Sequence, residues 1–62
     1  MSDANVVYEI ILERYAGDAA FVDGSISKAA EYVASRLGTI EDSNGDYSIE
    51  DIYTAVRWIK NA

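Results

Sequence analysis

The sequence predicts an all-α fold, a small bundle of three helices that forms a single domain over residues 1–62. Two observations lead to this expectation. The chain has only 62 residues, and a chain of this size buries about 60% of the surface that it exposes when unfolded, which leaves room for one hydrophobic core. In three segments, apolar residues recur every three or four positions, the spacing of one face of a helix. The expected helices cover about residues 3–16, 25–37 and 48–61.

The first expected helix, residues 3–16, has an apolar side and an acidic side. Val7 and Ile11 belong to the apolar side, whereas Glu9 and Glu13 recur on the opposite side. Gly17 follows this segment. We expect Gly17 to end the helix, because glycine adopts the left-handed backbone conformation at little steric cost.

The second expected helix follows Ser25, whose hydroxyl can cap the free amides of the first turn. It carries the most regular apolar stripe of the chain, and Gly38 provides its end. Between the first two helices, residues 18–22 are expected to form a short turn that places Phe21 in the core.

The third expected helix begins at Ser48, where the segment Ser48-Ile49-Glu50-Asp51 is close to a capping box. Its apolar positions again follow helical spacing almost to the end of the sequence. The stripes of the three helices together define the expected core, which consists of Val7, Ile11, Ile26, Ala30, Val33, Leu37, Ile52, Val56 and Ile59.

The connection between the second and third helices is the most acidic part of the chain. Five carboxylates fall within residues 41–51 with no basic residue among them. The dipeptide Asn44-Gly45 predicts a turn at its centre. One structural interpretation is an exposed connection, with Glu50 and Asp51 at the positive end of a helix dipole. The alternative is a short β-hairpin near residues 39–49 that pairs across this turn.

The same acidic segment resembles an EF-hand or dockerin-type calcium loop over about twelve residues. Oxygen-bearing side chains stand at alternating positions, as in such a loop, at Asp42, Asn44, Asp46, Ser48 and Glu50. The sixth position, which needs glycine, is Tyr47, and the twelfth position, which needs a bidentate acid, is Tyr53. The resemblance therefore implies at most a calcium half-site at residues 42–53, and we expect no cofactor and no dedicated metal site.

The composition argues against catalysis. The sequence has no His and no Cys, so it lacks a side chain that titrates near neutral pH of its own accord and lacks a thiolate nucleophile. Its serines therefore have no His to activate them, and no glycine-rich loop is present to cradle a phosphate. We expect a protein that is not an enzyme.

Charge and residue usage also limit the location and the partners. A pI of about 4.2 argues against direct binding to nucleic acid, because affinity for phosphates comes largely from Lys and Arg. Residues 1–5 lack the basic start of a signal peptide, and the apolar runs are far too short for a membrane span. Small secreted domains usually carry disulfides, whereas this chain has no Cys. We therefore expect a cytoplasmic protein that does not bind membranes.

These observations predict a small acidic protein-interaction module. We expect a regulator or inhibitor, of a phage-encoded type on the basis of size and acidity, that uses its formal charge of −6 to bind a basic protein surface. Trp58 lies off the apolar stripe of the third helix, so it either covers the edge of the core or anchors an interface. The alternatives are the calcium half-site and a structural homo-oligomer subunit, because oligomerisation can complete a thin core. The expected partner-binding residues are Glu9, Glu13, Glu41, Asp42, Asp46, Tyr47, Glu50, Asp51 and Trp58.

Overall fold

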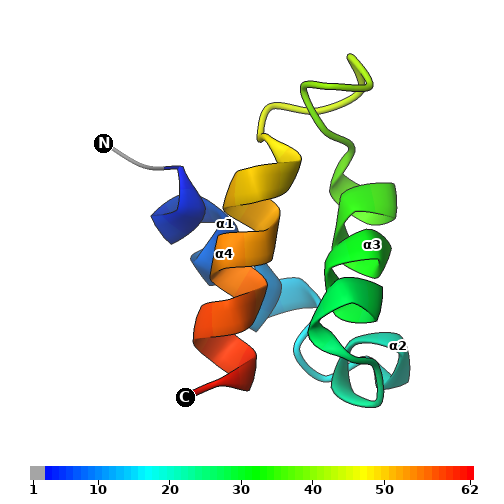
Figure 1. The fold of residues 1–62 in the computed structure, drawn as a ribbon, viewed down its shortest axis with the longest axis vertical. Coiled ribbons are helices and arrows are strands. Elements are labelled where there is room, and N and C mark those ends of the chain that lie inside the picture. The colour runs from blue at the N-terminus through cyan, green and yellow to red at the C-terminus, as the bar shows by residue number, and fades with distance from the viewer. Residues whose placement is uncertain (1–2) are drawn as a thin grey trace.

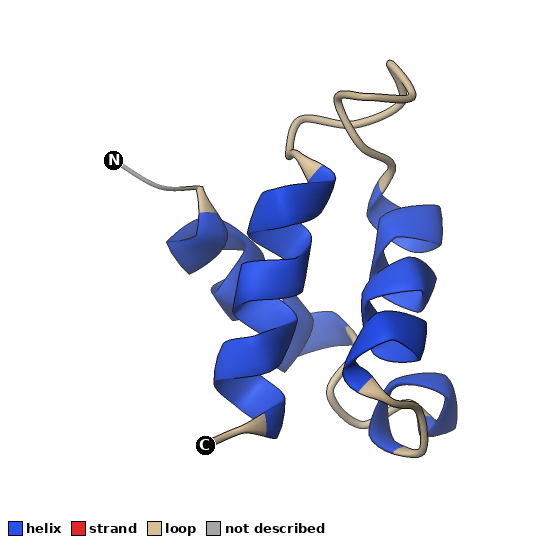
Figure 2. Ribbon diagram, viewed as in Figure 1, coloured by secondary structure: helices blue, strands red, loops and turns tan. Residues whose placement is uncertain are grey.

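The computed structural model describes residues 3–62, and over this range it is a bundle of helices without strands (Figures 1 and 2). The chain order is α1 (Ala4–Arg14), α2 (Ala19–Val22), α3 (Ile26–Leu37) and α4 (Ile49–Lys60). The all-α prediction is confirmed, and each of the three long helices matches its expected segment to within two residues. The short helix α2 occupies the turn expected at residues 18–22, and it buries Phe21 as predicted.

Helix α4 is the centre of the bundle. It packs against α1 on one side and against α3 on the other, while α2 packs against α3. In Figure 1, α4 crosses in front of α1, and α2 lies at the lower end of α3. The described chain is compact, with a radius of gyration of 10.3 Å. None of the helices in this part of the chain has the length and hydropathy that a membrane span requires.

Serine side chains cap the starts of α3 and α4, as the sequence predicted. The Ser25 hydroxyl accepts a hydrogen bond from the Lys28 amide at 3.2 Å at the start of α3. The Ser48 hydroxyl accepts one from the Asp51 amide at 3.1 Å at the start of α4. Such bonds satisfy amides that have no partner within the first helical turn. The predicted caps are therefore confirmed.

The expected end of the first helix at Gly17 is wrong. Helix α1 ends at Arg14, and Gly17 does not adopt a positive φ. The amides of Tyr15 and Ala16 both donate to the carbonyl of Ile11 at 2.9 Å. This shared acceptor closes the helix before the glycine is reached. At Gly38 the prediction holds, because its φ is 75° at the end of α3.

The core is richer in alanine than the sequence predicted. Six expected residues are buried, but Ile26, Leu37 and Ile59 are only partly buried and pack at its edge. Ile26 and Leu37 are the terminal residues of α3, and Ile59 lies in the last turn of α4, so neighbouring helices cover them on fewer sides. Small side chains allow the helices to approach closely at the centre. The buried hydrophobic residues are Ala4, Val7, Ile11, Phe21, Ala29, Ala30, Val33, Ile52, Ala55 and Val56.

The alternative of a β-hairpin near residues 39–49 is wrong, because the described residues contain no strand. One backbone bond of the expected kind is present, since the Ile40 amide donates to the Tyr47 carbonyl at 3.0 Å. The neighbouring Thr39 carbonyl instead accepts from the amides of Asn44 and Gly45 at 3.1 Å. These bonds turn the chain inward and prevent a ladder from extending.

Candidate protein-binding surface

The connection between α3 and α4, residues 38–48, is here called the acidic loop, and it projects from one end of the bundle (Figure 2). The backbones of Gly38 and Gly45 lie in close contact and hold the loop closed. A Cβ atom added to Gly45 would lie 2.5 Å from the carbonyl carbon of Gly38 and 2.7 Å from the carbonyl oxygen of Leu37. Only residues without side chains permit so close an approach of two backbone segments. The loop is therefore a closed fold-back whose ends meet, a form common among functional surface loops.

Thr39 holds the first half of the acidic loop from inside. Its side chain is buried, with 3% exposed. The hydroxyl donates to the Asp42 carboxylate at 3.2 Å and accepts from the Asp42 amide at 3.2 Å. The next residue, Ile40, points outward and is 54% exposed. The acidic loop therefore presents an apolar side chain beside its carboxylates, which the sequence analysis did not include among the site residues.

The exposed carboxylates of the acidic loop and of the adjoining first turn of α4 fall into two groups, those that accept a hydrogen bond and those that do not. Glu41 accepts a hydrogen bond from the Ile49 amide at 3.1 Å and so helps to cap α4 from outside the helix. Asp42 bonds to Thr39. By contrast, the side chains of Asp46 and Glu50 are exposed and form no hydrogen bond or ion pair within residues 3–62.

The remaining predicted residues of this region are partly buried. Tyr47 packs against the core from the end of the acidic loop. Asp51 is partly buried in the first turn of α4, where its amide is bonded to Ser48. Neither side chain is fully exposed. The exposed carboxylates at this end of the bundle are those of Glu41 and Asp42, which accept hydrogen bonds, and those of Asp46 and Glu50, which accept none within residues 3–62.

Glu9 and Glu13 lie on a different element from the acidic loop. Both are exposed on α1, on the side opposite the buried Val7 and Ile11. Since α1 packs on α4 through its buried side, the two glutamates face away from α4, whereas the acidic loop joins the start of α4 (Figure 1). The structure therefore presents two separate groups of predicted acidic residues. Glu9 and Glu13 have no side-chain hydrogen bond or ion pair within residues 3–62.

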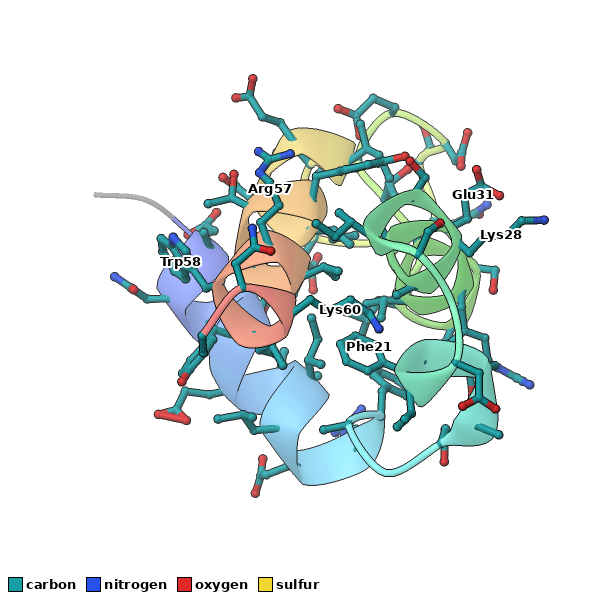
Figure 3. All side chains as sticks on the ribbon, turned by 60° about the horizontal axis from the view of Figure 1, so that its bottom comes forward. Phe21, Lys28, Glu31, Arg57, Trp58 and Lys60 are labelled. Carbon is teal, nitrogen blue, oxygen red and sulfur yellow. The ribbon has the colours of Figure 1, made fainter. Side chains whose placement is uncertain are left out.

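Trp58 lies at the edge of the contact between α1 and α4 (Figure 3). Its ring meets the ring of Tyr8 edge to face, with centroids 6.1 Å apart and planes at 70°. The side chain is nevertheless 44% exposed. Leu12, one helical turn after Tyr8 on α1, is 45% exposed. We call Tyr8, Leu12 and Trp58 the apolar strip.

Leu12 was missed by the sequence analysis, although a signal for it exists. From the sequence, α1 was expected to have one apolar side, defined by Val7 and Ile11. Tyr8 and Leu12 repeat the same four-residue spacing one position further round the helix. A second apolar row of this kind is a sign of an additional contact surface beside the core.

Two basic side chains, Lys60 of α4 and Arg36 of α3, lie against aromatic rings. The Lys60 ammonium lies 4.9 Å from the centroid of the Phe21 ring and donates to the Val22 carbonyl at 3.3 Å (Figure 3). The Arg36 guanidinium lies 5.4 Å from the centroid of the Tyr32 ring. Cation–π contacts of this kind are favourable by about 0.5–1 kcal/mol at exposed sites. These bases stabilise the fold locally and do not neutralise Asp46, Glu50, Glu9 or Glu13.

The described residues contain no group of three or more acidic side chains that could hold a metal ion, and no pocket was found among them. Comparison of the chain with protein-family models, curated proteins and solved structures finds no match.

Proposed function

We propose that this domain is a protein-interaction module without enzymatic activity, a small regulator or inhibitor that binds a basic protein surface. One observation carries the proposal. Asp46 on the acidic loop and Glu50 in the adjoining first turn of α4 are exposed, and no basic side chain within residues 3–62 pairs with them. A basic partner would supply the missing counter-charges.

The closed form of the acidic loop supports binding at this position. Gly38 and Gly45 bring the loop ends together, and Thr39 bonds to Asp42 across the first half. A segment that is ordered before binding loses little conformational entropy when the partner arrives. Ile40 adds an exposed apolar side chain beside the charges, a combination typical of a contact surface with a polar rim.

The overall charge supports the class of partner. A formal charge of −6 on 62 residues creates a negative field that attracts basic surfaces and repels nucleic acid and acidic membranes. The small size and this acidity support the narrower proposal of a phage-type regulator. The lack of Cys supports a cytoplasmic location, because compact secreted domains commonly depend on disulfides.

The test compares two variants that remove the same charge from different places. The loop variant is Asp46→Asn/Glu50→Gln, and the control variant is Asp23→Asn/Glu31→Gln, which changes exposed carboxylates on or beside α2 and α3. Each is immobilised and exposed to a lysate of the organism that encodes the chain. We expect the wild type and the control to retain a partner at about 0.1 M salt and to lose it at about 0.5 M, where the Debye length is roughly 4–5 Å.

The loop variant should retain that partner poorly even at low salt. Retention that does not depend on salt would contradict the proposal. Equal retention by the loop variant and the control would also contradict it, because the charge at the acidic loop would then have no special part in binding.

A further inference from the structure

We infer that the apolar strip, Tyr8, Leu12 and Trp58, is a docking surface for an amphipathic helix of a basic partner protein. The inference rests on the proposed function and adds to it the place of contact and the form of the partner segment. Two large apolar side chains, Leu12 of α1 and Trp58 of α4, remain nearly half exposed beside the buried core.

The apolar strip has the shape that a helix can use. Tyr8 and Leu12 stand one turn apart along α1. Trp58 reaches across from α4 and meets Tyr8 at a ring distance of 6.1 Å. All three side chains come from helices that pack on each other, so their positions are fixed by the bundle. Trp and Tyr are enriched at protein interfaces and among the residues that carry binding energy, and Leu12 adds exposed apolar area on the same helix as Tyr8.

The chemistry of the occupant follows from the charges beside the apolar strip. Glu9 follows Tyr8 by one position and Glu13 follows Leu12 by one position, so the glutamates form a parallel row on the side away from α4. Neither glutamate has a partner for its side chain within residues 3–62. A helix that complements both rows needs an apolar row with Lys or Arg beside it at the same four-residue spacing.

A second copy of this chain is a poor occupant of the same surface. It would bring its own Glu9 and Glu13 row and a further formal charge of −6 to the contact. Like charges placed close together at an interface oppose association. The charge complementarity therefore favours a basic helix over self-association.

The experiment uses Trp58 as the reporter, because it is the only Trp of the chain. The full chain is titrated with a synthetic amphipathic helix of about 14 residues made of Leu and Lys alone. One control peptide has the same composition in an order that destroys the helical pattern, and another replaces Lys with Glu. We expect a blue shift of Trp58 emission with the first peptide, and affinity at least about tenfold weaker for both controls.

Variants then test the residues of the strip. We expect Leu12→Ala to weaken binding of the amphipathic peptide about tenfold, and Glu9→Gln/Glu13→Gln to weaken it and flatten its salt dependence. Val22→Ala is the matched control, because Val22 is an apolar residue on α2 that is 55% exposed. It should bind as the wild type does. Circular dichroism of each variant verifies that the helices are intact.

Several results would overturn the inference. Equal binding of the patterned and reordered peptides would show that net charge alone accounts for the binding. Equal peptide binding by Leu12→Ala and Val22→Ala would show that the apolar strip does not contact the peptide. If Asp46→Asn/Glu50→Gln abolished peptide binding while the strip variants did not, the proposed function would stand and this docking site would fail. If the peptide-free chain sedimented above its 6.8 kDa mass and Leu12→Ala restored the monomer, a second copy would be the occupant. If neither the peptide nor a lysate protein bound, both proposals would fail.

Discussion

At the scale of single residues, Tyr32 connects separate parts of the chain. Its hydroxyl donates to the Asp18 carboxylate at 2.7 Å, which ties α3 to the residue before α2. The Tyr15 ring packs edge to face against the Tyr32 ring, with the ring centroids 5.9 Å apart, and the Arg36 guanidinium lies over the Tyr32 ring. The hydrogen bond to Asp18 raises the pKa of Tyr32, burial and the Asp18 charge raise it further, and Arg36 acts in the opposite direction.

The first prediction concerns the pH dependence of this contact. Since folding raises the pKa of Tyr32 above its ordinary value of about 10, the folded state holds the proton more tightly than the unfolded state. The resulting stability is complete below about pH 10 and is lost as the pH rises through the folded pKa. We expect urea unfolding of the wild type between about pH 9 and 11 to show a steeper loss of stability than Tyr32→Phe.

Tyr53→Phe is the control, because the Tyr53 hydroxyl makes no hydrogen bond within residues 3–62. It should keep the wild-type pH slope. Identical slopes for the wild type and Tyr32→Phe would show that the bond to Asp18 does not couple protonation to folding.

At the scale of elements, the three long helices and the acidic loop are specified in different ways. The helices depend on local features, namely apolar periodicity and the serine caps at Ser25 and Ser48. The loop depends on a contact between residues seven positions apart, since Gly38 and Gly45 touch through their backbones. The dipeptide Asn44-Gly45 predicted a turn, but the hairpin inferred from that turn was wrong. The amides of Asn44 and Gly45 both donate to the Thr39 carbonyl, so they do not take part in a strand ladder.

The second prediction uses two glycines as a matched pair. Gly45→Ala would place a Cβ atom 2.5–2.7 Å from the backbone of Gly38 and Leu37, so the loop must shift. We expect it to lower the free energy of unfolding by about 1–3 kcal/mol. Gly17→Ala meets nothing within 4 Å, and its φ is not positive. It should be neutral or stabilising by up to about 1 kcal/mol.

Urea denaturation monitored by far-ultraviolet circular dichroism measures both values. A cost for Gly45→Ala no larger than that of Gly17→Ala would show that the acidic loop opens easily. In that case the loop would not be ordered in advance for binding.

At the scale of the whole molecule, charge is distributed unevenly over a very small body. The formal charge of −6 is carried by a described chain with a radius of gyration of only 10.3 Å. Asp46 and Glu50 lie at the acidic loop end, and Glu9 and Glu13 lie on the outer side of α1, all without partners among the described residues. Self-repulsion of this kind destabilises a compact state.

The third prediction is therefore that salt stabilises the fold. Raising NaCl from about 10 mM to about 150 mM shortens the Debye length from roughly 30 to 8 Å and screens the repulsion. We expect the melting temperature to rise by a few degrees, as measured by circular dichroism. The rise should be smaller in Glu9→Gln/Glu13→Gln. A melting temperature that falls with added NaCl would indicate that attractive ion pairs dominate the stability.

Local sequence patterns were enough to predict the three long helices, their approximate ends and most of the buried residues. Helix formation depends on neighbours three or four positions apart, and this information is contained in any short segment. Val7, Ile11, Val33 and Ile52 could be placed in the core because each lies in the middle of an apolar stripe.

How these helices pack on one another, and which side chains they leave exposed, became clear from the fold alone. Three alanines, Ala4, Ala29 and Ala55, became buried because the closest approach between helices accommodates small side chains. The exposure of Leu12 and of Trp58 depends on where α1 crosses α4, which no local pattern specifies. For the same reason, the sequence could name the acidic residues of the candidate surface, but only the fold separated them into the acidic loop and the row beside the apolar strip.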